Sequence, residues 1–168
     1  MFNTFLRNNQ VVGIILTFLR IYLGYTWFTA GWSKLTGDGF NASGYLKGAI
    51  GKATGEHPAV QGWWASFLEN VALPNSELFS FLVMWGEILV GIALILGIFT
   101  TFATLMGLTM NFAFLFSGTV STNPQMVIIG TILLVAGYNA AKFGLDRWVL
   151  PLMKKPFPTR EQKNEKYV

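Results

Sequence analysis

Two charged residues, Arg20 and Glu87, lie inside long apolar stretches of the sequence. An ionised side chain near the middle of a bilayer costs at least about 2.5 to 3.5 kcal/mol, so such residues are expected to have a partner and a function. A guanidinium and a carboxylate offset this cost by pairing, because the donors of the guanidinium fit the two carboxylate oxygens. We therefore predict an Arg20–Glu87 pair, with Asn111 of a third apolar stretch beside it.

Two interpretations of this polar layer remain open. It is either a structural clasp that fixes helix register, or part of a cavity that holds a polar head group or carries protons. Nearby aromatic side chains suit a flat, quinone-like ring: Tyr22, Tyr25, Trp27, Phe28 and Trp85. Lys34, just beyond the first apolar stretch, is most simply an interfacial anchor, and it is also in reach of an anionic ligand at the outer mouth. The predicted cofactor-binding residues are Arg20, Trp27, Lys34, Glu87 and Asn111.

The residue types also exclude several chemistries. The chain has no cysteine and one histidine, His57. Disulfides, thiolate nucleophiles, Cys-ligated iron–sulfur clusters and bis-histidine haem are therefore excluded, and no metal site is evident. The basic residues do not alternate with aromatic residues along one face, so we expect no nucleic-acid partner.

The composition is that of a membrane protein. Of the 168 residues, 52% are apolar and only 12% are charged, and the mean hydropathy is +0.47; soluble domains carry about 25% charged residues. Hydropathy predicts an all-α integral membrane protein, a four-helix bundle with spans at about residues 11–32, 79–99, 101–116 and 126–141. The last two spans are shorter than the roughly 20 residues that a full crossing needs. The first is too long for the apolar core of a signal peptide.

The rest of the chain divides around these spans. Residues 1–150 are predicted to form one membrane domain, with an outer loop at 33–78, and residues 151–168 a polar cytoplasmic tail. Within the loop, one apolar helical face predicts an amphipathic interfacial helix, made by Val60, Trp63, Trp64, Phe67, Leu68 and Val71. Packing of this face on other loop residues is the alternative. After the last span, Asp146 and Arg147 are expected to form a local interfacial pair.

Depth along the spans supports a common polar layer. At 1.5 Å per residue, Arg20, Glu87 and Asn111 lie roughly 14, 18 and 15 Å from the same edge of the membrane. Lysine and arginine are concentrated at the N-terminal arm and after residue 141. The positive-inside rule therefore places both termini in the cytoplasm and the long loop outside, in a multi-pass protein of the cell membrane.

Three segments resemble one family. They are LRIYLGYTWFTAGWSKL (19–35), GEILVGIALILGIFTTFATLMGLTMN (86–111) and GYNAAKFGLDRWVLP (137–151). Together they are similar to the DoxX family, and the third segment looks like the DoxX/DoxD branch described as the large subunit of a thiosulfate:quinone oxidoreductase. The resemblance implies a four-helix membrane protein of quinone-linked redox or redox-stress complexes. The family's polar positions fall on Arg20, Lys34, Glu87 and Asn111.

The leading hypothesis is thus a membrane subunit of a quinone-dependent oxidoreductase. The chain would supply a quinone pocket and a proton path, and a partner subunit or a second copy would complete the complex. Two alternatives remain: a small proton-coupled transporter that uses Glu87 as its switchable carboxylate, or a structural membrane anchor for a partner enzyme. A transporter should show substrate-dependent proton flux. A structural anchor should keep its fold and its function when Arg20 and Glu87 are exchanged for each other.

Overall fold

The computed structural model describes residues 2–37 and 40–153, and the secondary structure in these ranges is entirely helical. This confirms the predicted all-α class. The helices are α1 (Phe2–Asn8), α2 (Gln10–Thr36), α3 (Ala42–Gly51), α4 (Gly62–Phe67), the π-helical turn η1 (Leu68–Ala72), α5 (Ser76–Leu96), α6 (Thr100–Phe116), α7 (Asn123–Ala136), α8 (Tyr138–Ala141) and α9 (Asp146–Met153).

Two of these helices, α2 with 27 residues and α5 with 21, are long and apolar enough to cross a membrane. The apolar helices α6 and α7 are shorter, with 17 and 14 residues. The fourth predicted span is interrupted at Gly137, whose positive φ of 57° ends α7. Helix α9 runs through the predicted boundary at residue 150, and residues 154–168 of the predicted tail lie outside the described residues.

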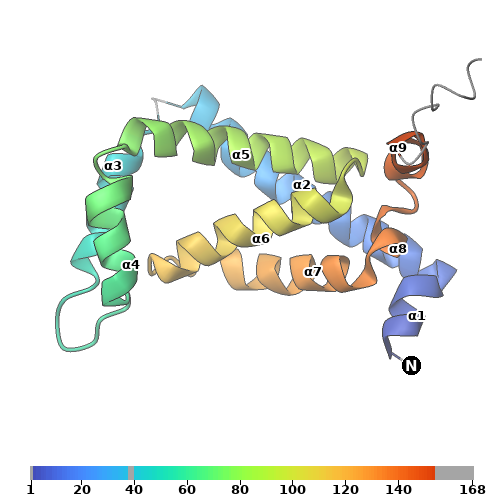
Figure 1. Ribbon diagram of the computed structural model, residues 1–168, viewed down its shortest axis with the longest axis horizontal. Coiled ribbons are helices and arrows are strands. Elements are labelled where there is room, and N and C mark those ends of the chain that lie inside the picture. Colours follow the sequence, from blue (N-terminus) through green and yellow to red (C-terminus); the bar gives the residue numbers. More distant parts are fainter. Residues whose placement is uncertain (1, 38–39, 154–168) are drawn as a thin grey trace, which may run out of the picture.

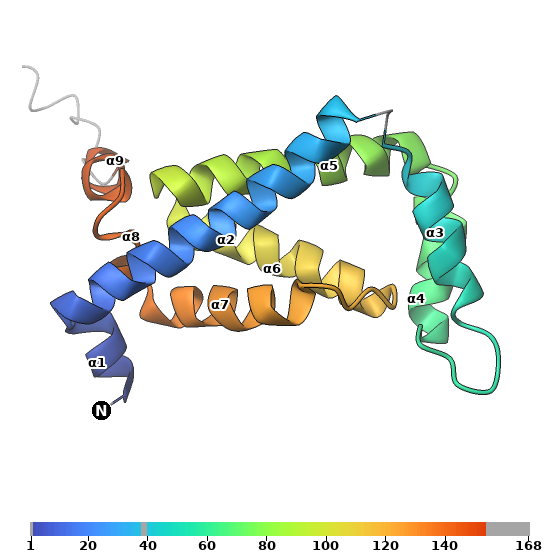
Figure 2. The ribbon, with the colours of Figure 1, turned by 180° about the vertical axis from the view of Figure 1, so that it is seen from behind.

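The four longer helices pack together and the short ones gather at their two ends (Figures 1 and 2). Helix α2 packs mainly on α5, and α6 mainly on α7. Helices α3 and α4 lie across one end of this group, which we call the α3 end. Helices α1, α8 and α9 lie at the opposite end, the α8 end.

The α2–α5 contact depends on glycines. A Cβ atom at Gly24 would lie 2.8 Å from the backbone nitrogen of Ile95, and one at Gly31 would lie 2.8 Å from that of Ile88. A Cβ atom at Gly91 would be closer still, at 2.5 Å from the backbone nitrogen of Phe28. The pairs run in opposite directions along the two helices, so α2 and α5 are antiparallel. Because only glycine permits this approach, the two backbones touch and their register is fixed.

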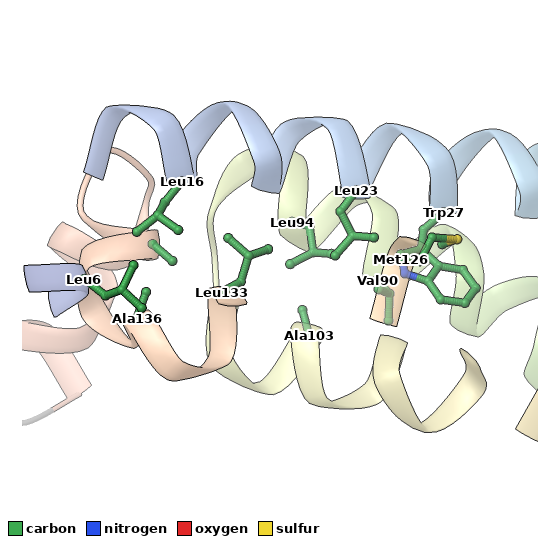
Figure 3. Close-up of a cluster of buried hydrophobic side chains, with 11 residues drawn as sticks. Leu6, Leu16, Leu23, Trp27, Val90, Leu94, Ala103, Met126, Leu133 and Ala136 are labelled. Carbon is green, nitrogen blue, oxygen red and sulfur yellow. The ribbon is translucent and has the colours of Figure 1, made fainter. Parts of the chain in front are cut away.

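A continuous apolar core fills the space between the four helices (Figure 3). Leu16 and Leu23 of α2 pack with Leu94 of α5 and Leu133 of α7. Toward the α3 end, this core finishes at Trp27, Val90 and Met126. A second cluster joins α3 to η1 through Ala42, Leu46, Leu68 and Ala72.

The outer loop differs from its prediction. Helix α3 was not predicted, and the expected helix over residues 60–71 is α4 followed by the π-helical turn η1. A π-turn inserts extra residues into the helical repeat and rotates the residues after it. Leu68 and Ala72 of this turn are buried, whereas Trp63 and Val71 are exposed. The position of this segment at a membrane interface stays a prediction.

Asp146 holds the tight turn between α5 and α6. The turn needs positive φ angles at Gly97 and Phe99. The Asp146 carboxylate accepts hydrogen bonds from the backbone N–H groups of Phe99, at 2.6 Å, and Thr100, at 2.8 Å. It is buried and caps α6, so the predicted surface pair of Asp146 with Arg147 is wrong. Arg147 instead lies over the Trp148 ring, 4.9 Å from its centroid.

Arg20 is buried beside this turn. Its Nη1 donates to the backbone carbonyl of Ala140 at 3.0 Å, and the Asp146 carboxylate attracts it electrostatically. Gly97 and Gly144 leave room for the guanidinium, because a Cβ atom at either position would collide with Nη1. We call this group, Arg20 with Asp146 and the Ala140 carbonyl, the Arg20 clasp. It ties α2 to α8 and to the α5–α6 turn.

We predict that Asp146→Ala lowers the free energy of unfolding by at least about 2 kcal/mol. Loss of a helix cap costs up to about 2 kcal/mol, and a buried Arg20 without its carboxylate adds to this loss. Thermal or denaturant unfolding in detergent, followed by circular dichroism, measures the change. The exposed neighbour supplies the control, since Arg147→Ala should change stability by less than about 0.5 kcal/mol. Equal effects of the two substitutions would contradict the clasp.

Candidate functional site

Glu87 of α5 is paired with Lys34 of α2. The Nζ atom of Lys34 lies 2.6 Å from Oε2 of Glu87. The Glu87 side chain is only 2% exposed, whereas that of Lys34 is 23% exposed. The carboxylate is therefore inside the protein, and the ammonium lies between it and the surroundings.

The predicted Arg20–Glu87 pair is wrong, and the register of α2 on α5 explains the error. Gly31 lies against Ile88, next to Glu87, whereas Arg20 is eleven residues earlier on α2, roughly 16 Å away along the helix axis. Side-chain direction separates the two charges further. Side chains on a helix lean toward its N-terminus. In the antiparallel pair, Arg20 on α2 leans toward the α8 end and Glu87 on α5 leans toward the α3 end, so the two diverge. Lys34 lies further along α2 and leans back toward Glu87. The depth estimate treated the ends of the two apolar stretches as level, and the register of α2 on α5 shows that they are not.

Part of the charged pair remains free to bind a ligand. Within the described chain, Oε1 of Glu87 accepts no hydrogen bond, while Oε2 is held by Lys34. Among the described residues, Lys34 has two weaker contacts besides Glu87. Its Nζ lies 3.4 Å from the Ala30 carbonyl oxygen and 5.5 Å from the centre of the Phe40 ring. An ammonium has three N–H donors. The pair can therefore donate to one ligand atom and accept from another.

Lys34 and Glu87 both line a cavity of about 320 Å³ at the α3 end. Its floor is the end of the apolar core, at Trp27 and Met126 (Figure 3). Its walls and roof are mostly apolar or aromatic and include Ala30, Phe40, Leu46, Trp64, Phe67, Leu68, Phe79, Val83 and Phe114. The size and the few polar groups are typical of a small-molecule site.

The roof of the cavity is formed by α3, α4 and η1 and is fastened to the end of α6. The hydroxyl groups of Tyr45 and Thr119 are 3.0 Å apart, and Nε1 of Trp64 donates to Oγ of Ser117 at 2.9 Å. Lys52 donates to the Gly118 carbonyl at 3.0 Å. On the α5 side, the backbone N–H of Ala42 donates to Ser80 at 2.8 Å. The roof is thus attached on both sides of the cavity.

Of the residues predicted to bind a cofactor, the structure brings three together at this cavity: Trp27, Lys34 and Glu87. Arg20 lies in its clasp at the other end of the core. Asn111 lies behind the cavity wall, where its Nδ2 donates to Oδ1 of Asn123 at 2.8 Å and its own oxygen has no partner among the described residues. Whether any of these residues binds a cofactor stays a prediction.

Several cavity residues were not identified from the sequence, namely Phe40, Tyr45, Phe79, Phe114 and Asn123. Phe40 and Tyr45 lie on α3 or in the loop before it, where no helix was predicted. The signal that marks α3 in ASGYLKGAIG (42–51) is the helical spacing of its buried residues Ala42, Leu46 and Ala49, at i, i+4 and i+7. Within residues 2–37 and 40–153, no three acidic, histidine or cysteine side chains form a cluster suited to a metal.

Comparison with known proteins gives one match. The sequence model of the DoxX family matches residues 15–119, which include most of α2, all of α3 to α6 and every element of the roof. Searches of curated proteins and of solved structures return no significant match.

We predict that Lys34 and Glu87 are energetically coupled. In a double-mutant cycle with Lys34→Met and Glu87→Leu, each single change leaves one charge without its partner, and the double change removes both. The double variant should therefore be more stable than the sum of the two losses predicts, by about 1 kcal/mol or more. Unfolding in detergent measures all four proteins.

An exposed lysine of α3 provides the control for this cycle. Lys47→Met combined with Glu87→Leu should give a coupling free energy near zero, because Lys47 is exposed and makes no ion pair with Glu87. Additive effects of Lys34→Met and Glu87→Leu would mean that the pair does not form in the folded protein.

Proposed function

The chain belongs to the DoxX family of membrane proteins, and on this basis we propose that it is the quinone-binding membrane subunit of an oxidoreductase complex. The ring would lie in the cavity at the α3 end, beside Lys34 and Glu87. The observation that carries this proposal is an ion pair with a buried carboxylate that lines a mostly apolar, aromatic cavity. A site of this kind is expected to bind a flat ligand that is apolar over its faces and polar at one edge.

The residues of the cavity fit a quinone in both chemistry and size. The free N–H groups of Lys34 can donate to a ring carbonyl, and Oε1 of Glu87 can accept from a ring hydroxyl. Trp64, Phe67 and Phe79 provide flat apolar surfaces above it. When bound, a quinone accepts two electrons and two protons to become a quinol. Lys34 and Glu87 would orient the ring and hold or release protons at Nζ and Oε1.

The electrons must come from another protein. The chain has no cysteine, so it offers no thiol for sulfur chemistry. We therefore assign oxidation of the electron donor, a thiosulfate-like sulfur compound by family resemblance, to a partner subunit. The present chain would supply the ring site and the groups that exchange protons with it. A complex with a second copy of the same chain is part of the same proposal.

We also propose that α2, α5, α6 and α7 all cross the cell membrane as a four-helix bundle. The basic residues of α1, Arg7, and of the α8–α9 region, Lys142 and Arg147, would then face the cytoplasm, as the positive-inside rule requires. The α3 end would face outward. In this orientation the cavity lies in the outer half of the membrane, and the roof covers it from the outer aqueous side.

We predict that a quinone binds the purified protein in nanodiscs and quenches its tryptophan fluorescence. Lys34→Met and Glu87→Gln should each raise the dissociation constant about tenfold or more, since a hydrogen bond to a charged group contributes about 1.5 to 3 kcal/mol. Arg20→Lys and Lys47→Met should bind within about twofold of the unchanged protein, because neither residue lines the cavity.

Each variant must first show an unchanged helical spectrum and remain folded at the temperature of the binding assay. Quinone binding that is indifferent to Lys34 and Glu87 would move the site elsewhere. No saturable binding at all would reject the quinone proposal and favour a structural anchor or a transporter, which proton flux in vesicles would separate.

A further inference from the structure

We infer that the cavity takes an amphiphile directly from the lipid, through an opening between α2 and α7. The ligand class is therefore a polar ring with a long apolar tail, rather than a tail-less molecule that arrives from water. This inference rests on the proposed function, because the ring is taken to bind at Lys34 and Glu87. It adds the route, the tail and the residues that line the opening.

The other sides of the cavity are closed by direct contacts. The α2–α5 side is closed by Gly24, Gly31 and Gly91, where backbones touch. On the α5–α6 side, a Cβ atom at Gly86 would lie 3.2 Å from the sulfur of Met110. On the α6–α7 side, Gly130 lies against Leu108, with Asn111 bonded to Asn123.

Access from the aqueous side at the α3 end is covered by the roof. The hydrogen bonds of Tyr45 with Thr119 and of Trp64 with Ser117 lie across this end of the cavity. Under the roof, the buried side chains of Leu46, Leu68 and Ala72 pack together. A ligand that entered here would have to break hydrogen bonds and an apolar cluster at once.

The α2–α7 side lacks such a closure. Helices α2 and α7 approach each other toward the α8 end and diverge toward the α3 end (Figures 1 and 2). Toward the α3 end, the last residues that the two helices contribute to the apolar core are Trp27 of α2 and Met126 of α7. Beyond them both helices still line the cavity, α2 with Ala30 and the start of α7 with Asn123 and the preceding N-cap residue Thr122. Among the described residues, no hydrogen bond joins α2 to α7.

Thr26 lies at the edge of this opening. It lines the cavity and is two residues, or about 200° around the helix, from Gly24, which faces α5. It is therefore on the side of α2 that is turned away from α5. Thr29 provides a matched control on the same helix. Each threonine donates its hydroxyl to the backbone carbonyl four residues earlier, but Thr29 does not line the cavity.

The test compares two ligands, a benzoquinone ring with a ten-carbon tail and the same ring without it, on protein in nanodiscs with concentrations expressed per lipid. In the unchanged protein both should bind in a manner that depends on Glu87. Thr26→Phe should weaken the tailed ring at least fivefold and leave the tail-less ring within twofold. Thr29→Phe should change neither. Binding of the tail-less ring also shows that each variant is folded.

If Thr26→Phe does not fold, Thr122→Trp on the α7 side of the opening gives the same comparison. Equal binding of the tailed ring by the unchanged protein and by the folded opening variant would overturn the lateral route and leave the quinone site standing. Binding of neither ring by the unchanged protein would remove the proposed function and this inference together. If Thr26→Phe weakened the binding of both rings equally, Thr26 would contact the ring itself, which would also overturn the assignment of the tail to the opening.

Discussion

The direct contact of the α2 and α5 backbones determines where the charged side chains of this protein can meet. Gly24, Gly31 and Gly91 allow an approach that any side chain would prevent, and such an approach fixes the register of two antiparallel helices. Because side chains lean toward the N-terminus of their own helix, this register also decides which charges pair. Lys34 and Glu87 lean toward each other, and Arg20 leans away from both.

Two buried charged groups therefore lie at opposite ends of one apolar core, and their surroundings differ. Arg20 is enclosed by the α5–α6 turn, α8 and the Asp146 carboxylate, and it does not line the cavity at the α3 end. Its contacts join separate segments of the chain, as a structural role requires. Glu87 has one oxygen free, faces an aromatic cavity and is separated from the surroundings by a partly exposed lysine. A ligand can reach this second group but not the first.

The sequence predicted the class, the apolar helices and the family, because these depend on composition, hydropathy and local motifs. It also selected Lys34, Glu87 and Trp27, which the structure gathers at one cavity. It failed on the Arg20–Glu87 pair because depths counted from the ends of two apolar stretches do not give the register of α2 on α5. Asp146 looked like a surface residue because its partners, the N–H groups of Phe99 and Thr100, are 47 and 46 positions away. The helices of the roof were predicted only in part, because α3 is short and only weakly apolar.

Everything proposed for the cavity depends on the ion pair of Lys34 with Glu87, and zero-length cross-linking tests this pair most directly. A carbodiimide activates a carboxyl group and joins it to an amine in contact with it. Treatment of the protein in its native membrane, with mass spectrometry as the readout, should yield one peptide pair linked between Glu87 and Lys34. Activation of Glu87 without this link, seen as a carbodiimide adduct on Glu87 alone, would contradict the pair and the site built on it.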